Sequence, residues 1–101
     1  MTSVEIRRTE RFARWLDDLR DDRARARILV RIRRLSLGNP GDVRRIGGGL
    51  CEVRVNYGPG YRVYFTQPGK VVFLLVGGDK RTQSRDIAEA RAMAVSLSQR
   101  W

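Results

Sequence analysis

The stretch from residue 50 to residue 85 constrains the fold more than any other part of the chain. It contains three consecutive strand patterns: residues 50–56 and 61–66 alternate apolar with polar side chains, and residues 71–76 are apolar throughout. The first two are joined by the turn sequence Gly58-Pro59-Gly60. This order predicts a β-hairpin followed by a third strand of the same sheet.

Side chains alternate between the two faces of a strand, so the pattern also assigns an orientation to each residue. Six residues are expected to face the core: Cys51, Val53, Val55, Tyr61, Val63 and Phe65. Their neighbours then face away and gather on one solvent-side surface: Glu52, Arg54, Arg62 and Tyr64. The third strand is expected to break at Gly77-Gly78, after which Asp79 forms a turn and the pair Lys80-Arg81 reaches the same surface. Cations and an aromatic ring on a rigid sheet predict a site for a polyanion.

The charge balance supports this interpretation. The 101 residues include 21 Lys+Arg against 11 Asp+Glu, a formal net charge of +10, and Lys70 and Lys80 are the only lysines. Arginine forms bidentate contacts with phosphate, so the composition points to nucleic acid or to an acidic protein partner. The length fits one domain over residues 1–101.

Several kinds of chemistry are disfavoured by what the sequence lacks. A single cysteine, Cys51, permits no internal disulfide, and the absence of histidine argues against a zinc site and removes the usual general base. We therefore expect no cofactor. No apolar segment is long enough to span a membrane and the N-terminus has no signal-peptide core, which predicts a cytoplasmic protein without a membrane partner.

A helical hairpin is predicted before the hairpin of strands. Alternation of Val4 and Ile6 with charged residues indicates a short first strand, and Thr9 suits the N-cap of a helix. Two apolar stripes with helical spacing follow: Phe12, Trp15, Leu16 and Leu19, then Ala24, Ile28, Ile32 and Leu35. Asp21-Asp22 separates the stripes, and Gly38-Asn39-Pro40-Gly41 ends the second.

The polar face of the second helix is crowded with arginine. Its members are Arg23, Arg25, Arg27, Arg31, Arg33 and Arg34. Three interpretations stay open: a nucleic-acid surface that includes Arg31 and Arg34, an ordinary solvated face, or a dock for an acidic protein segment. Residues 42–49 are expected to form a loop whose Arg44 and Arg45 can add contacts to a nucleic acid.

A last helix is predicted after the strands, capped within Thr82-Gln83-Ser84 and carrying the apolar stripe Ile87, Ala90, Ala94 and Leu97. Arg85 lies in its first turn, where the helix dipole disfavours a cation unless an anion binds there. Trp101 can cap the core or dock on a partner. The predicted fold is α+β, in the order β-α-α-β-β-β-α, with the helices on one face of a mostly antiparallel sheet.

Several of these segments together resemble a known family. They are Leu50-Cys51-Glu52-Val53-Arg54, Gly58-Pro59-Gly60-Tyr61-Arg62-Val63-Tyr64, Leu74-Leu75-Val76-Gly77-Gly78-Asp79-Lys80, Thr82-Gln83 and Asp86-Ile87. In this combination the chain resembles the RelE/ParE toxin superfamily, and more closely its HigB-like branch of addiction module killer proteins. The resemblance spans nearly the whole chain and implies a RelE-like fold and the toxin of a type II toxin–antitoxin pair.

The resemblance also implies an activity and its partners. RelE- and HigB-like toxins cleave mRNA in the ribosomal A site, so the expected partners are mRNA, the ribosome and a cognate antitoxin, often a helix-turn-helix protein. Arg54 stands where RelE-like toxins carry a basic residue, Arg62 matches the Gly-Tyr-Arg element, and Lys80-Arg81 matches the basic pair after the last strand. The chain departs from RelE at Glu52, in place of a lysine, and at Ile87, near the position of a catalytic tyrosine.

The resulting hypothesis is an endoribonuclease that works mainly through positive charge. Arg62 and Arg54 are assigned to the scissile phosphate, and Lys80 or Arg81 to the charge on the leaving oxygen. Tyr64 is assigned to base stacking or proton transfer, and Glu52 is the nearest carboxylate base. RNA contacts are expected from Arg44, Arg45, Arg85, Arg31 and Arg34. Two alternatives remain: a ParE-like gyrase inhibitor that acts by binding, and a nucleic-acid-binding module without catalysis.

Overall fold

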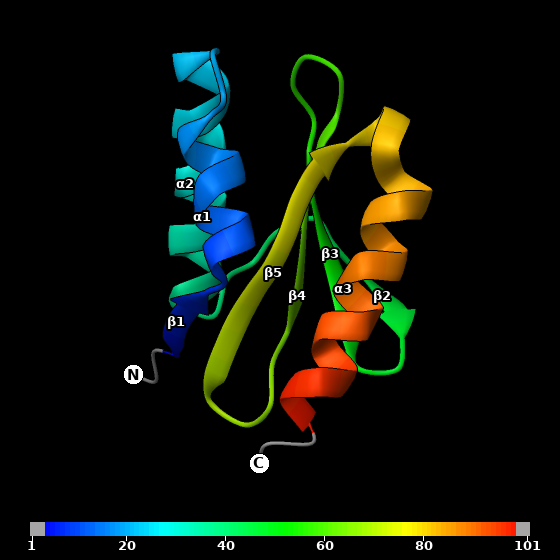
Figure 1. The fold of residues 1–101 in the computed structure, drawn as a ribbon. Helices are drawn as coiled ribbons and strands as arrows, with labels where there is room; N and C mark the ends of the chain where they lie inside the picture. Colours follow the sequence, from blue (N-terminus) through cyan, green and yellow to red (C-terminus); the bar gives the residue numbers. More distant parts are fainter. Residues whose placement is uncertain (1–3, 99–101) are drawn as a thin grey trace.

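The computed structural model describes residues 4–98 as an α+β fold with a five-stranded mixed sheet and three α-helices (Figure 1). The strands are β1 (Glu5–Arg8), β2 (Val43–Gly47), β3 (Leu50–Val55), β4 (Tyr61–Thr66) and β5 (Val71–Asp79). The helices are α1 (Glu10–Asp17), α2 (Asp22–Ser36) and α3 (Gln83–Ser98), and a short 3-10 helix η1 (Lys80–Thr82) precedes α3. The strand order in the sheet is β1-β5-β4-β3-β2.

The helical hairpin α1–α2 covers one face of the sheet. Helix α1 begins at the predicted cap, where the Thr9 hydroxyl accepts a hydrogen bond from the Phe12 backbone N–H at 3.0 Å. Helix α2 begins within the predicted break between the stripes, where the Asp21 carboxylate accepts from the Ala24 backbone N–H at 3.2 Å. Their apolar stripes pack on the inward side chains of the strands. The buried members of this core are Phe12, Leu16, Ile28, Leu35, Val53, Val55, Val63, Phe65, Val72 and Leu74. The predicted stripes of both helices are confirmed.

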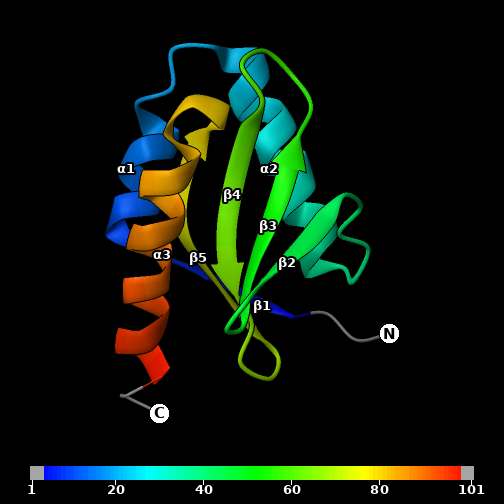
Figure 2. The ribbon, with the colours of Figure 1, turned by 90° about the vertical axis from the view of Figure 1, so that its right-hand side faces the viewer.

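Helix α3 covers the opposite face of the same sheet, as the two perpendicular views show (Figures 1 and 2). Its buried core is smaller and consists of Leu50, Tyr64, Phe73, Leu75, Val76 and Ala90. Ile87, Ala94 and Leu97 are packed against it, which confirms the predicted stripe of α3. Trp101 lies outside the described residues. The expectation that all helices share one face is wrong, because strands β3 to β5 carry apolar side chains on both faces.

Two further expectations about the sheet require correction, and that of a mostly antiparallel sheet is confirmed. Residues 42–49 contain strand β2, which pairs antiparallel with β3, rather than only a loop. Strand β5 does not break at Gly77-Gly78 but continues to Asp79. Strand β1 pairs in parallel with β5, so the sheet is mixed, although the β2–β3, β3–β4 and β4–β5 pairs are antiparallel. The helix and strand order therefore matches the prediction with one strand added.

The two glycines of β5 are explained by what lies against them. A Cβ on Gly77 would lie 2.2 Å from the Trp15 ring, and a Cβ on Gly78 would lie 1.9 Å from Asp86 Oδ2. Both distances are far below any real carbon contact. Glycine at these positions thus allows α1 and α3 to approach the same strand from opposite sides, and it does so without ending the strand.

Candidate functional site

The candidate site lies on the α3 face of strands β3 and β4. Arg54 pairs directly with Arg62 across the two strands, and Glu52 pairs with Tyr64 two register positions away, on the same face. Arg44 of β2 pairs with Glu52, which places it on the same face. The period-2 prediction that Glu52, Arg54, Arg62 and Tyr64 share a face is confirmed. The prediction that this face is a solvent surface is wrong for Glu52 and Tyr64, which are both 0% exposed because α3 covers them.

Glu52 is the centre of a buried polar network. Arg62 Nη1 donates to Glu52 Oε1 at 2.9 Å, and Gln83 Nε2 at the start of α3 donates to Glu52 Oε2 at 3.3 Å. Arg44 Nη2 lies 3.8 Å from the same carboxylate. A buried carboxylate requires such partners. The network holds the Arg62 side chain, of which 14% is exposed, in one place at the rim of the covered region.

Tyr64 lies beside this network and is sealed from solvent. Its hydroxyl oxygen has no hydrogen bond of ordinary geometry within the described residues. Burial, and after it the negative charge of Glu52, raise the pKa of Tyr64 well above its usual range. A covered ring cannot stack on a base, and a phenol with a raised pKa is a weak proton donor at neutral pH.

Arg54 is the more exposed of the two paired arginines. Its Nη2 donates to Asp42 Oδ1 at 3.0 Å, and this hydrogen bond lowers the pKa of the Asp42 carboxyl. Asp42 is held in place from α2, because Arg31 donates from Nη1 to the Arg54 carbonyl at 2.7 Å and from Nη2 to the Asp42 carbonyl at 3.2 Å. The Nε atoms of Arg54 and Arg62 are buried without a hydrogen-bond partner in the described part of the chain.

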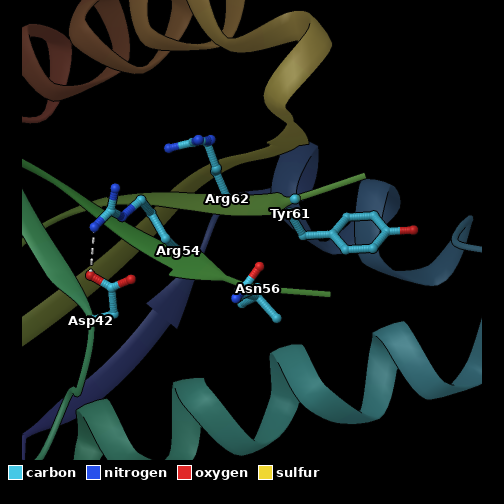
Figure 3. A pocket seen from close by; sticks show the side chains of 7 residues that line it. Asp42, Arg54, Asn56, Tyr61 and Arg62 are labelled. Atoms are coloured by element: carbon cyan, nitrogen blue, oxygen red, sulfur yellow. Dashed lines mark hydrogen bonds and ion pairs between the residues drawn. The ribbon is translucent and has the colours of Figure 1, made fainter. Parts of the chain in front are cut away.

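A cavity of about 300 Å³ opens beside these arginines. It lies where strand β2 has ended and the edge of β3 is uncovered. Figure 3 shows five of its lining side chains, Asp42, Arg54, Asn56, Tyr61 and Arg62, with the two arginines directed toward α3 and Asn56 between them and α2. The cavity therefore joins the cationic face to the free end of the β3–β4 hairpin.

The two residues of the basic pair after β5, Lys80 and Arg81, differ in their contacts. Arg81 forms an ion pair with Asp79, with Nη2 and Oδ2 3.1 Å apart. Asp79 also accepts from the Arg81 backbone N–H, which makes it the N-cap of η1 and confirms its role in the turn. Lys80 is exposed, and its Cβ lies 3.8 Å from the position of a Cβ on Gly60. Lys80 thus stands at the end of the cavity where the strands turn.

The remaining predicted RNA contacts are dispersed. Arg45 pairs with Cys51 and so faces the side opposite Arg44. The Arg31 guanidinium donates to main-chain carbonyls, and Arg34 is exposed on α2 beside a second groove, which shares Val55 and Asn56 with the cavity. Arg85 in the first turn of α3 is exposed, and its Nε lies 3.8 Å from the buried Asp86. The structure thus brings Arg44, Arg54 and Arg62 together and leaves Arg31, Arg34 and Arg45 elsewhere.

Three residues of the site were not predicted from the sequence. In the sequence Gln83 belongs to the predicted helix cap and to the segment Thr82-Gln83 of the family resemblance, Asp42 starts the predicted loop, and Asn56 ends a predicted strand. Asn56 stands next to a turn signal at the end of an alternating strand, where a polar residue is ordinary. No pattern in the sequence distinguishes them, because their positions depend on where β2 ends and where α3 crosses the sheet.

Two absences within residues 4–98 complete the description. No group of three or more histidine, cysteine, aspartate or glutamate side chains gathers there as a possible metal site. Among those same residues, none of the helices combines the length and apolar character needed to cross a membrane.

Comparison with known proteins identifies a family and a relative to which the chain is similar. The family described as "Phage derived protein Gp49-like (DUF891)" matches residues 14–95, which is most of the chain and includes every residue of the site. An uncharacterized protein of Haemophilus influenzae is 45% identical over 96 residues, which cover 94% of this chain and 97% of the relative.

Proposed function

Because the chain belongs to the family of phage-derived Gp49-like proteins, which is associated with RelE-like toxins, we propose that it is the toxin of a type II toxin–antitoxin pair. We further propose that it is a ribosome-dependent endoribonuclease that cleaves mRNA and thereby stops translation. The resemblance of the Gly-Tyr-Arg and Gly-Gly-Asp-Lys segments to the RelE/ParE superfamily supports the same proposal.

One observation carries the proposal: Arg54 and Arg62 stand side by side on a rigid pair of strands, at the mouth of a cavity. Acidic side chains fix both guanidinium groups from behind, at 3.0 Å for Arg54 and 2.9 Å for Arg62. Donors that are already oriented stabilise developing negative charge without reorganising during the reaction. This is the arrangement that a phosphate in RNA cleavage requires.

Each residue then receives a role. Arg62 and Arg54 bind the scissile phosphate and stabilise the charge that develops on its oxygens as the 2′-oxygen attacks. Lys80, exposed beside the turn, neutralises the 5′-oxygen as it leaves, while Arg81 is partly neutralised by Asp79. Glu52 acts through Arg62 as a positioning residue, since its carboxylate is buried and occupied.

The site is better suited to stabilising negative charge than to general base catalysis. Both groups proposed from the sequence for proton transfer, Glu52 and Tyr64, are fully buried. Arginine stays protonated and cannot accept the proton of the 2′-hydroxyl. Such an enzyme is expected to be slow on free RNA and to depend on the ribosome to hold the mRNA in a reactive geometry, which agrees with a toxin of translation.

The antitoxin of the proposed pair has a matching surface on α2. A groove there is lined by Arg27, Val30 and Arg34, and Val30 is 55% exposed. Exposed apolar side chains between arginines suit an acidic amphipathic segment by charge complementarity. The groove shares Val55 and Asn56 with the cavity of the candidate site, so a segment docked there would reach the edge of that cavity.

The decisive experiment is cell-free translation followed by mapping of new mRNA ends. We expect the wild-type protein to produce cuts within codons and Arg62→Ala to reduce them by about 100-fold, the usual effect of removing one well-aimed donor. Arg54→Ala should reduce cutting less, because Arg54 is more exposed. Arg8→Ala removes the same charge from the exposed strand β1 at the far edge of the sheet and should cut normally.

Other outcomes would redirect the proposal. Undiminished cleavage by the double variant Arg54→Ala/Arg62→Ala would reject the assignment of the site. Gyrase-dependent DNA breaks without mRNA cuts would favour a ParE-like inhibitor. Salt-dependent binding of oligonucleotides without either activity would leave a binding module without catalysis.

A further inference from the structure

The cavity beside the arginine pair has features that phosphate binding does not require. Its volume of about 300 Å³ lies at the small end of the range for ligand pockets, so it suits one compact group. It exists because β2 separates from β3 after the hydrogen bond from the Arg54 backbone N–H to the Asp42 carbonyl, at 3.1 Å. Beyond that point the edge of β3 is open at Val55 and Asn56.

Asn56 offers an unused hydrogen-bonding group at this edge. It is exposed, and within residues 4–98 its side-chain amide takes part in none of the hydrogen bonds formed. An asparagine amide has two donors and one acceptor on a planar group, which is the complement of a nucleobase edge. The backbone fixes its position, because the following residue, Tyr57, donates its N–H to the Val55 carbonyl at 2.9 Å.

An aromatic residue lies at one end of the cavity. Tyr61 is among its lining residues, and its ring packs on the hairpin face of the sheet against Trp15 in an edge-on contact, with ring centroids 6.3 Å apart. Tyr57 is held at the same end, where the Arg27 guanidinium carbon lies 4.7 Å from the centroid of its ring. Sequence-specific recognition of RNA uses unstacked bases that meet aromatic surfaces and hydrogen-bonding groups together.

From this combination we infer that the cavity is a subsite for one unpaired nucleobase, whose phosphate is held by Arg54 and Arg62 and whose edge is read by Asn56. The inference deepens the proposed function and rests on it, since it takes the substrate to be RNA. It makes Asn56 a specificity-determining residue for the nucleotide next to the phosphate.

The test is a titration without ribosomes, followed by the amide signals in nuclear magnetic resonance spectra. The purified protein is titrated with inorganic phosphate and with each of the four nucleoside 5′-monophosphates. We expect all five to shift the signals of Arg54 and Arg62. At least one nucleotide should also shift the Asn56 side-chain amide and bind about tenfold more tightly than phosphate, as a well-matched amide–base pair does.

Matched variants identify the source of the preference. Asn56→Ala should bind phosphate as the wild type does but lose the tenfold preference for the nucleotide. Asn39→Ala removes the same side chain from the exposed loop after α2 and should keep the preference. Equal binding of all five probes, or a preference that survives Asn56→Ala, would overturn the inference, as would shifts of Asn56 by an acidic peptide alone.

The two proposals fail in different experiments. If the protein cuts no mRNA in cell-free translation but shows the preference that depends on Asn56, the nuclease proposal fails and the subsite stands. If it cuts mRNA through Arg62 but binds every nucleotide as weakly as phosphate, the subsite fails and the nuclease proposal stands.

Discussion

The two faces of the sheet are formed by the same strands but bury different kinds of side chain. Among residues 4–98, the fully buried side chains under α1 and α2 are hydrophobic, from Phe12 to Leu74. The face under α3 buries Glu52 and Asp86 together with a smaller apolar core. Burying a charge costs free energy unless partners satisfy it, whereas apolar burial stabilises without such conditions. The contrast indicates that the hairpin face contributes most of the stability and that the α3 face holds the side chains of the candidate site in place.

The two glycines of β5 show the same difference between the faces. Gly77 receives the Trp15 ring on the hairpin face, and Gly78 receives the Asp86 carboxylate on the α3 face. Thr82 Oγ1 donates to Asp86 Oδ2 at 2.5 Å, so this carboxylate ties the start of α3 to η1, which directly follows β5. Close packing therefore serves the hydrophobic core on one side and the placement of Gln83 above Glu52 on the other.

The largest effect on stability is expected from the hairpin face. Phe12 is 0% exposed, so Phe12→Ala leaves a cavity and should lower the free energy of unfolding by about 3–5 kcal/mol. Leu29→Ala, on the same pair of helices but 45% exposed, should change it by less than about 0.5 kcal/mol. Urea unfolding measures both. A small effect of Phe12→Ala would mean that this face does not dominate stability.

An intermediate effect is expected from the buried ion pair on the α3 face. Glu52→Ala leaves the Arg62 guanidinium without its carboxylate in a mostly covered position, so we expect a loss of about 3 kcal/mol in the free energy of unfolding. Glu89→Ala, which breaks an exposed pair with Arg11, is the matched control and should cost less than about 1 kcal/mol. Cleavage of mRNA should fall with Glu52→Ala as far as with Arg62→Ala.

A double variant separates the two roles of that pair. Replacing Glu52 and Arg62 together by leucine removes both charges and should restore much of the stability, because apolar residues can replace a buried ion pair. The same variant should cut no mRNA. If it keeps both stability and activity, the pair serves neither the site nor the fold, and the contrast between the two faces would not hold.

The sequence predicts the hairpin face of the sheet better than the α3 face. Helical stripes and strand alternation predicted the hairpin face well, because burial of Phe12, Ile28 and Val63 follows directly from the spacing of apolar residues. The same alternation placed Glu52 and Tyr64 on the correct face. It could not predict their burial, since that depends on α3 crossing the sheet, and nothing in the local pattern of β3 or β4 contains this information.

The error at Gly77-Gly78 has a similar cause. Two glycines after an apolar run are a common end of a strand, whereas here they allow tertiary contacts with Trp15 and Asp86. Strand β2 was missed because its residues Val43 to Gly47 include two arginines and a glycine, which are poor strand formers as a group. Pairing with β3 stabilises this strand, and it also brings Asp42 to Arg54.

The smallest effect is expected at the exposed rim of the α3 face, where Asp42 occupies Arg54. Asp42→Asn removes the competing negative charge and should raise the affinity for inorganic phosphate about twofold to fivefold, the range expected for loss of an exposed ion pair. Glu10→Gln breaks the exposed pair with Arg14 on α1 and should leave phosphate affinity unchanged. Isothermal titration calorimetry measures both, and an equal or weaker affinity of Asp42→Asn would show that the orientation of Arg54 by Asp42 outweighs the competition from its negative charge.

The pH dependence of stability provides a second measurement on the same pair. The hydrogen bond from Arg54 lowers the pKa of Asp42 in the folded protein below its ordinary value. A carboxyl group of this kind contributes stability that is fully present above the pKa of the unfolded chain, near 4, and is lost as the pH falls through the lower pKa of the folded protein. The wild type should therefore be more stable than Asp42→Asn between pH 5 and pH 8, by about the same amount throughout. Below the folded-state pKa of Asp42, the free energies of unfolding of the wild type and of Asp42→Asn should converge. Urea unfolding at a series of pH values measures this difference. A difference that persists in acid would show that it does not come from the charge of the Asp42 carboxylate.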